Sequence, residues 1–238
     1  MMEKENLIAQ NVAQVKEKIV KAAMKAGRDP EEITLIAATK TQTGETIRAA
    51  IGAGITVCGE NRVQEMLPHL EENAYEGAKV HFIGHLQTNK VRQVVGEADL
   101  IQSVDSLRLL DAIQKQAEKR ELIQDVLLEV NIGREENKGG VLPEELPGLV
   151  DHVQTLSHVR LRGLMCIPPA TATEDALRGF FKETRQLFVD TRNKISNNNS
   201  NVDCLSMGMS GDYPLAIEEG ATMVRVGTAL FGARPPIR

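Results

Sequence analysis

The chain has 238 residues, of which 42% are hydrophobic and only 3% aromatic, so any large core must be built from aliphatic side chains. The net charge of −5 argues against nucleic acid as a main partner, because binding to phosphate backbones needs a basic face. The sequence shows neither an apolar run long enough to span a membrane nor a signal peptide, which favours a cytoplasmic protein. The cysteines lie in apolar runs, and we expect buried free thiols at Cys58, Cys166 and Cys204.

The apolar pattern along the chain alternates between helical spacing and short continuous runs. Residues 3–26 have apolar side chains at helical spacing, which predicts an amphipathic helix that ends at Gly27. Beyond it, short apolar runs predict strands at 33–38, 55–58, 80–83, 100–102, 125–130, 159–164, 202–205 and 222–226. Helices are expected between them at 44–52, 62–72, 87–95, 106–120, 144–155, 174–194 and 213–219.

Eight such strand–helix units after one extra N-terminal helix predict an α/β fold, a (β/α)8 TIM barrel, in a single domain over residues 1–238. We interpret the polar run at 197–201 as a surface insertion. The alternative is an open doubly wound sheet. It is weaker because no Gly-x-Gly-x-x-Gly follows the first strand.

Polar side chains gather close to the ends of the expected strands, where barrels place their chemistry. Residues at these positions are Lys40, Asn61, His85, Ser103, Asn131, Met165, Ser210 and Arg225. The strands themselves are almost wholly aliphatic. We therefore expect a polar rim above a dry core.

Small residues follow the seventh and eighth strands in the segments LSMGMSGD (205–212) and VRVGTA (224–229). Glycines allow a backbone to approach a ligand closely, and Ser210 and Asp212 can cap a helix whose amides suit an anion. These turns predict a phosphate site, with Lys40 on the neighbouring first strand. A lysine there raises the hypothesis of a Schiff base with pyridoxal 5′-phosphate (PLP). The residues alone leave this open, because a lysine at a strand end is more often solvated or ion-paired.

Several longer motifs make the hypothesis specific. They are AATK (37–40), CGENRVQE (58–65), HFIGHLQTNK (81–90), GLM (163–165), LSMGMS (205–210) and RVGTALFG (225–232). In order and spacing the chain resembles the pyridoxal phosphate homeostasis protein family from about residue 6 to 234. The departures, such as Ala-Thr before Lys40 where the family often has Val-Ser, remove no ligand group. The resemblance implies an alanine-racemase-type barrel, called fold type III among PLP proteins, which binds PLP covalently through Lys40 and has no established reaction.

The resemblance also implies roles for other residues. Ser210, Gly211, Gly227 and Thr228 would hold the phosphate, and Arg225 would face the pyridine nitrogen of PLP. A guanidinium can only donate hydrogen bonds, so it would keep that nitrogen unprotonated and make the ring a weak electron sink. The alternative for Arg225 is a structural ion pair with Glu218 or Glu219.

The other candidate ligands have equally ordinary alternatives. Asn61 could hydrogen-bond the phenolic oxygen of PLP, or it could cap a helix in a capping box with Gln64. Met207 and Ile83 could pack on the pyridine ring, or they could belong to the core. No metal site is expected, because His81 and His85 flank a strand end and no carboxylate pairs with them.

The resemblance implies a protein of intracellular PLP homeostasis that buffers PLP or delivers it to PLP-dependent apo-enzymes, and so affects amino-acid and keto-acid metabolism. The alternative is an amino-acid racemase of the alanine-racemase type. Racemisation needs a second base, which those racemases carry as a tyrosine on an additional C-terminal β-domain. The chain ends soon after the eighth expected strand, so we expect that domain to be lacking. We therefore expect a monomeric PLP-binding protein that is not an enzyme.

Overall fold

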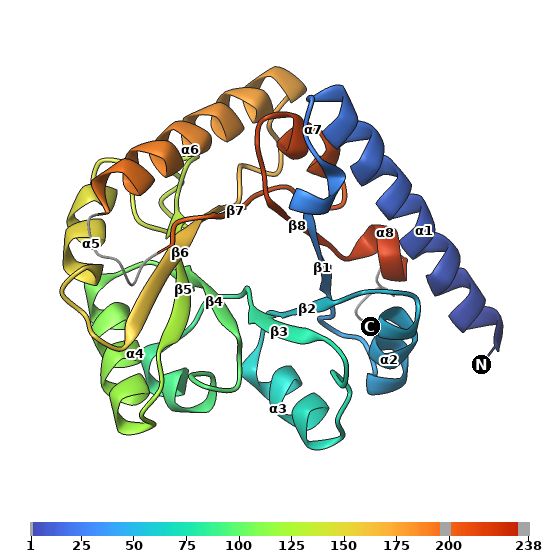
Figure 1. Cartoon of the computed structure of the whole chain (residues 1–238), viewed down its shortest axis with the longest axis horizontal. Helices are drawn as coiled ribbons and strands as arrows, with labels where there is room; N and C mark the ends of the chain where they lie inside the picture. Colours follow the sequence, from blue (N-terminus) through green and yellow to red (C-terminus); the bar gives the residue numbers. More distant parts are fainter. Residues whose placement is uncertain (1, 196–200, 233–238) are drawn as a thin grey trace.

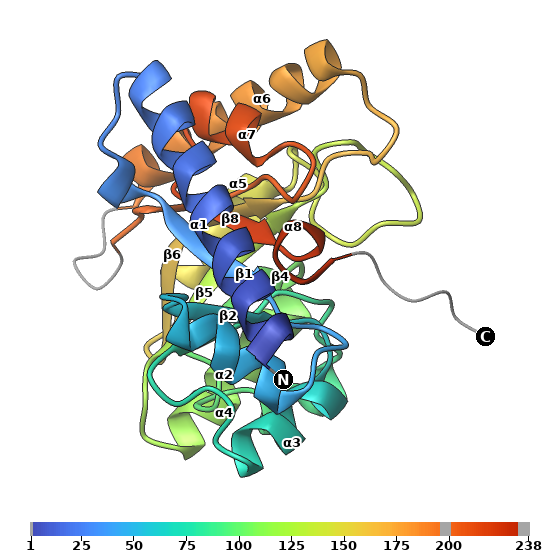
Figure 2. The ribbon, with the colours of Figure 1, turned by 90° about the vertical axis from the view of Figure 1, so that its right-hand side faces the viewer.

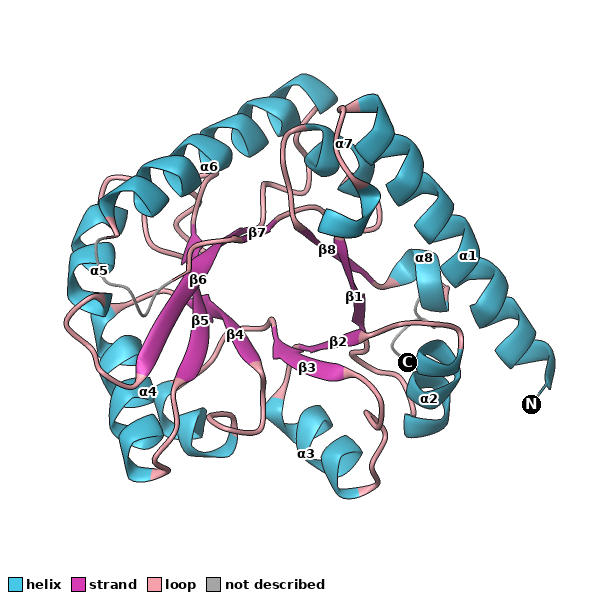
Figure 3. Cartoon of the chain, viewed as in Figure 1, coloured by secondary structure: helices cyan, strands magenta, loops and turns pink. Residues whose placement is uncertain are grey.

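Eight parallel strands close into a barrel in chain order, and the predicted fold class is thereby confirmed (Figure 3). The computed structural model describes residues 2–195 and 201–232. The pairing of β1 with β8, which places Ile36 opposite Arg225, closes the sheet and rules out the open doubly wound alternative. The strands are β1 (Thr34–Ala38), β2 (Val57–Glu60), β3 (Lys79–Phe82), β4 (Leu100–Val104), β5 (Gln124–Val130), β6 (Val159–Cys166), β7 (Cys204–Ser206) and β8 (Met223–Val226).

The helices surround the barrel. They are α1 (Met2–Lys25), α2 (Gly44–Gly52), α3 (Val63–Glu71), α4 (Leu107–Lys119), α5 (Leu146–Val153), α6 (Glu174–Lys194), α7 (Tyr213–Glu218) and α8 (Thr228–Phe231), with 3-10 turns η1 (Pro30–Glu32) and η2 (Thr88–Gln93). Side-chain oxygens of Thr43, Ser106 and Thr173 accept an amide hydrogen bond at the starts of α2, α4 and α6, which defines where these helices begin. The extra helix α1 packs beside α2, α7 and α8, as two views show (Figures 1 and 2).

Some element boundaries differ from the predictions. The helix expected at 87–95 is only the 3-10 turn η2, which ends at Gln93, and Val95 then forms a β-bridge with Ala98. Strand β2 continues to Glu60, so Asn61 follows it directly. The short helix α8 was not predicted. Residues 197–200 of the expected insertion lie outside the described part of the chain.

Most of the core lies between the barrel and the helices, and it is aliphatic as predicted. A smaller apolar cluster contains Leu100, Leu127, Met165 and Cys204. The predicted dry interior below the rim is wrong, because four polar side chains are buried there and bonded to one another. They come from β3, β4, β7 and β8: His81, Gln102, Ser206 and Arg225. Side chains alternate between the two faces of a strand. Each of these polar residues faces the interior, whereas its apolar neighbours face the helices, and the apolar neighbours led to the prediction of a dry interior.

The cysteine prediction is confirmed, since Cys58, Cys166 and Cys204 are free and buried. Burial raises the pKa of the Cys166 thiol to about 11 and those of the other two to about 12. These thiols are therefore unreactive small core residues. Within the described residues, no helix has the length and apolar character that a membrane crossing requires.

Candidate functional site

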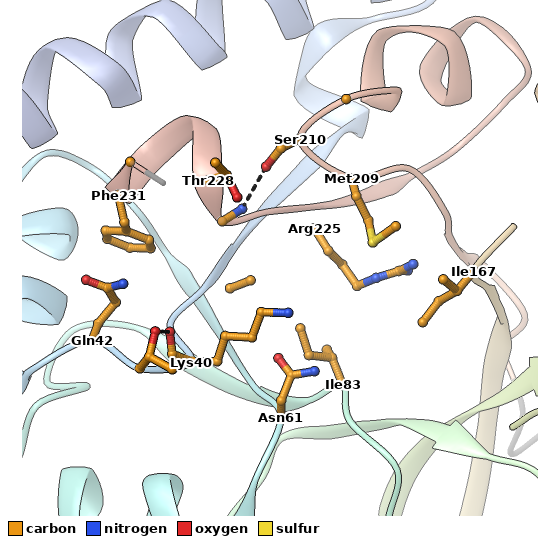
Figure 4. Close-up of a pocket in the computed structure, with 15 residues that line it drawn as sticks. Lys40, Gln42, Asn61, Ile83, Ile167, Met209, Ser210, Arg225, Thr228 and Phe231 are labelled. Atoms are coloured by element: carbon orange, nitrogen blue, oxygen red, sulfur yellow. Dashed lines mark hydrogen bonds between the residues drawn. The ribbon is translucent and has the colours of Figure 1, made fainter. Parts of the chain in front are cut away.

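A cavity of about 280 Å³ opens at the carboxyl ends of the strands (Figure 4). The loops after β1, β2, β3, β6, β7 and β8 supply most of its wall. The predicted residues that line it are Lys40, Asn61, Ile83, Ser210, Gly211, Arg225, Gly227 and Thr228. Residues that the sequence analysis did not single out complete it: Ala38, Thr41, Gln42, Ile167, Met209, Phe231 and Gly232.

Met207 is not part of this lining, although it was a candidate for packing on a bound ring. Its side chain is fully buried in the aliphatic core, and Met209 lines the cavity instead. The turn between them explains the exchange. Gly208 has a φ of +92°, and a Cβ at this position would lie 2.6 Å from that of Ala216. The backbone reverses here, so the ordinary core interpretation holds for Met207.

The backbone on both sides of Lys40 is held firmly. The Thr39 amide donates to the Gly59 carbonyl at 3.0 Å, and the Thr41 amide donates to Glu65 Oε2 at 2.9 Å. Thr41 itself has a φ of +65°, an uncommon conformation for a β-branched residue. The surrounding structure therefore imposes the direction in which the chain leaves β1, and the Lys40 side chain extends into the cavity (Figure 4).

A buried carboxylate behind the cavity connects the ends of β1 and β2. Glu60 is fully buried, and its Oε1 accepts hydrogen bonds from Thr39 Oγ1 at 2.5 Å and from the Tyr75 hydroxyl at 2.7 Å. Burial raises the pKa of Glu60, and these two hydrogen bonds oppose the shift. Because Thr39 precedes Lys40 and Glu60 precedes Asn61, the cluster fixes the relative positions of two residues of the cavity wall.

Ser210 organises the turns after β7 and β8. Its Oγ accepts hydrogen bonds from the amides of Gly227 at 3.1 Å and Ala229 at 3.3 Å. A hydroxyl has two acceptor lone pairs and one proton, so the hydroxyl proton of Ser210 remains as a donor. The Gly227 amide, which was expected to bind a phosphate directly, is thus paired with Ser210.

Asp212 also shapes this turn. It is the N-cap residue of α7, but its carboxylate accepts from the Met209 amide at 2.6 Å and caps no amide of the helix. The predicted helix cap is therefore replaced by a bond within the loop. The effect is to hold Met209 at the edge of the cavity.

Arg225 lies on the floor of the cavity and is only 4% exposed. Its Nη1 donates to Ser206 Oγ at 2.6 Å, and its Nη2 donates to the Cys166 carbonyl at 2.8 Å. Burial lowers the pKa of the guanidinium, but an arginine stays protonated in proteins. The alternative ion pair is wrong, because Glu218 and Glu219 instead bind Arg178.

Asn61 presents a buried polar atom to the cavity. Its Oδ1 has no hydrogen-bond partner among the residues that the structure describes. The alternative helix cap is wrong, because α3 has Arg62 at its N-cap and no side-chain cap. A buried amide oxygen without a partner costs free energy, and a ligand that donates to it relieves that cost.

The described residues contain no group of three His, Cys, Asp or Glu side chains that could hold a metal ion. His81 is buried inside the barrel, whereas His85 is exposed and lies 3.6 Å from Asp105. The two histidines therefore do not converge. The chemistry of the cavity is that of one primary amine, one guanidinium, hydroxyls and amides.

Three comparisons place the chain among known proteins. The model of the family "Alanine racemase, N-terminal domain" matches residues 7–235. The chain is 45% identical to the pyridoxal phosphate homeostasis protein of Aquifex aeolicus over 225 residues, which cover 94% of this chain and 97% of that protein.

Solved structures agree with this placement. The structure of PipY from Synechococcus elongatus PCC7942 with PLP bound superposes with a TM-score of 0.82 at 32% identity, covering 94% of this chain and 100% of that one. Alanine racemase from Corynebacterium glutamicum superposes with a TM-score of 0.72 at 14% identity, and the match covers 97% of this chain and 62% of the racemase. The latter likeness shows the shared fold alone.

Proposed function

Since the chain belongs to the pyridoxal phosphate homeostasis protein family, within the wider family of the alanine racemase N-terminal domain, we propose that it binds PLP in this cavity and buffers or delivers the cofactor. The observation that carries the proposal is the placement of Lys40 in one cavity with Ser210, Thr228, Arg225 and Asn61. These groups match the aldehyde, phosphate, ring nitrogen and phenolic oxygen of PLP.

The residues present fit this cofactor on structural grounds. At about 280 Å³ the cavity lies just below the roughly 300–1,000 Å³ range of small-molecule sites, which suits a compact ligand. The Asn61 amide oxygen lacks a partner, and the Ser210 hydroxyl proton is available as a donor. Arg225 supplies a fixed positive charge on the floor. The site thus offers a hydrogen-bond acceptor at Asn61, a donor at Ser210 and a positive charge at Arg225 to an aromatic phosphate.

In this proposal Lys40 holds the cofactor covalently. Its ε-amino group would form the covalent link to the aldehyde carbon of PLP, and water would be released. Ser210 and Thr228 donate hydrogen bonds to the phosphate, and Ile83 packs beside the ring. Bound PLP supplies an electron sink for carbanion chemistry, but Arg225 weakens it by donating to the ring nitrogen.

The composition of the cavity wall favours a carrier over the alternative racemase. A racemase needs a base on each face of the bound substrate. Among the described lining residues, Lys40 is the single group that can act as a base, because the others carry amide, hydroxyl, guanidinium or apolar groups. Both tyrosines, Tyr75 and Tyr213, are buried elsewhere. We therefore propose that PLP is held for transfer to apo-enzymes.

Absorption spectroscopy tests the covalent site. We expect purified protein with PLP to show a visible absorption band that borohydride reduction abolishes, leaving the cofactor attached to the chain. Lys40→Ala should show neither the band nor a borohydride-stable adduct. Lys115→Ala, which changes a lysine on α4, is the matched control and should behave as the wild type. A wild type with no band after PLP addition would refute the assignment.

A second measurement separates the carrier from the racemase. We expect PLP-loaded protein to restore activity to an apo-transaminase, and to leave the optical rotation of L-alanine unchanged over hours. Racemisation of alanine at enzymatic rates that depends on Lys40 would establish the alternative. Failure to reactivate any apo-enzyme would leave buffering as the function.

A further inference from the structure

Below the cavity, four polar side chains form a continuous hydrogen-bonded chain across the interior of the barrel. Arg225 Nη1 is 2.6 Å from Ser206 Oγ, which is 2.7 Å from Gln102 Oε1, and Gln102 Nε2 is 2.9 Å from His81 Nδ1. No side chain of the four is more than 4% exposed. The chain begins at a residue of the cavity wall and ends on β3, so it connects β8, β7, β4 and β3.

The chemistry of Arg225 sets the direction of every bond in this chain. A guanidinium cannot accept, so Ser206 Oγ accepts from it and donates its single proton to Gln102 Oε1. The amide group of Gln102 then faces His81 with its nitrogen, which can only donate. His81 Nδ1 must therefore carry a lone pair, and the ring proton lies on Nε2. Reversing the Gln102 amide would leave the Ser206 proton without an acceptor inside the barrel.

This hydrogen-bonded series of side chains restricts the orientation of the Arg225 guanidinium. One guanidinium nitrogen is bound to Ser206 and the other to the Cys166 carbonyl, at 2.8 Å. Two bonds from different nitrogens fix the plane of the group as well as its position. Ser206 keeps its own orientation only while Gln102 accepts its proton, and Gln102 keeps its orientation only while His81 accepts from it. The plane of the Arg225 guanidinium therefore depends on Gln102 and His81, which do not contact Arg225 directly.

We propose that Gln102 and His81 are positioning residues of the cofactor site, which hold the Arg225 guanidinium through Ser206 so that it presents fixed donors to the ring nitrogen of PLP. This role rests on the proposed function. The positioning role extends the proposed function, because it makes PLP binding depend on residues that do not line the cavity. Preorganised donors bind more tightly because no rearrangement is needed when the ligand arrives.

The test compares two buried glutamines. Gln102→Met keeps the volume of the side chain but removes both of its bonds in the chain. Gln124→Met is the matched control, because Gln124 is 3% exposed on β5 and bonds to Ala98 and Gly96 outside the chain. Both variants lose a buried amide, so their losses of stability should be similar. PLP affinity and the absorption band of the bound cofactor are measured by titration.

We expect Gln102→Met to bind PLP about tenfold more weakly, which corresponds to the loss of one well-oriented hydrogen bond, with a shifted absorption band. At saturating PLP it should still give the borohydride-stable adduct, since Lys40 is intact. Gln124→Met should keep the wild-type affinity and band. Ser206→Ala, which is smaller by one oxygen, serves if Gln102→Met does not fold, and the same loss is expected.

The tautomer of His81 provides a readout that simple loss of packing does not change. ¹⁵N NMR of the cofactor-free wild type should show an unprotonated Nδ1 and a protonated Nε2. In Gln102→Glu an oxygen faces the ring, so the proton should move to Nδ1 while the acceptor for Ser206 is kept. Wild-type affinity and band in both Gln102→Met and Ser206→Ala would overturn the positioning role alone. A wild type that does not bind PLP would overturn the proposed function and this role with it.

Discussion

The wall of the barrel has two parts that differ in strand length. The long-strand wall contains the two longest strands, β5 and β6, with 7 and 8 residues, together with the neighbouring β4, which at 5 residues is no longer than β1. The pairing of β5 with β6 continues from Gln124↔Val159 to Val130↔Cys166. In the short-strand wall, β7, β8, β1, β2 and β3 have 3 to 5 residues. There β7 and β8 share the single registered pair Ser206↔Met223.

The cavity belongs almost entirely to the short-strand wall. Lys40, Asn61, Ser210, Arg225 and Thr228 all come from it, whereas the long-strand wall contributes Ile167 after β6. The turns that follow these strands carry backbone amides and side chains that form no part of the sheet ladder and are available to a ligand. One side of the barrel thus has the most extended strand pairing, and the other side provides the binding groups.

The largest expected effect is on stability, at the contact between β6 and β7, where the two walls meet. Gly163 on β6 has a φ of +149°, and a Cβ there would collide with the carbonyl of Cys204 on β7. We expect Gly163→Ala to lower the free energy of unfolding by about 3–5 kcal/mol, because about 1–3 kcal/mol of backbone strain adds to a steric clash of about 1–3 kcal/mol. Urea denaturation measures it. Gly148→Ala is the control, because nothing lies within 4 Å of its Cβ in α5, and it should stabilise by about 0.5–1 kcal/mol. If the two substitutions changed the free energy of unfolding equally, the close approach of β6 to β7 at Gly163 would not be important for stability.

The second prediction makes one substitution on each wall. Ser210→Ala removes the acceptor for two amides and a proposed phosphate donor, so PLP affinity should fall about 10- to 100-fold, or about 1.5–3 kcal/mol. Ser106→Ala removes the cap of α4, next to the long-strand wall, and should cost about 1 kcal/mol of stability with PLP affinity unchanged. Titration and thermal unfolding of both variants check it. An unaltered affinity in Ser210→Ala would remove this residue from the site.

The third prediction concerns pH and the long-strand wall. Burial, together with the nearby Asp105 carboxylate, raises the pKa of Glu129 on β5 to about 7. Between its ordinary pKa of about 4.5 and this value the folded state binds more protons than the unfolded state. The Glu129 contribution to stability therefore falls as pH rises, with a slope of at most about 1.4 kcal/mol per pH unit.

Glu129→Gln should remove this slope between about pH 4.5 and 7, as followed by urea denaturation at several pH values. The exposed Glu136→Gln removes the same formal charge from the following loop and serves as the control. The prediction fails if the two variants show the same pH dependence.

The smallest expected change in PLP affinity is at Asn61, which is compared with Asn131, another asparagine that follows a strand. Asn61→Leu removes a buried oxygen without a partner, so stability should stay equal or rise by up to about 1 kcal/mol, while PLP affinity falls about fivefold. Asn131, after β5, bonds both to the Glu135 carbonyl at 2.9 Å and to the Glu135 amide at 3.1 Å. Asn131→Leu should therefore cost about 1–3 kcal/mol of stability and leave affinity unchanged. If Asn61→Leu lowered stability and Asn131→Leu lowered PLP affinity, the short-strand wall would not be the one that binds PLP.

Much of the short-strand wall could be predicted from local sequence. Small residues at 206–211 and 227–228 indicate turns where backbone approaches a ligand, and Lys40, Asn61 and Arg225 stand at or near strand ends. The exchange of Met207 for Met209 could not be predicted, because it depends on the turn at Gly208 packing against α7. Ile167 lies two residues after Met165, so it points to the same inner face of the barrel. This position could have been predicted if the end of β6 had been placed at Cys166 and not at 164.

The sequence by itself determined the barrel, because periodic apolar runs specify each strand and helix locally and eight such units have one common way to bury their faces. It also indicated which rim holds the polar groups. Only the tertiary structure decided the partners of these groups: in the hydrogen-bonded chain from Arg225 to His81, Ser206 and Gln102 are bonded although they are 104 positions apart in the sequence. Hydrogen bonds across a barrel depend on closure and stagger, which no local pattern encodes.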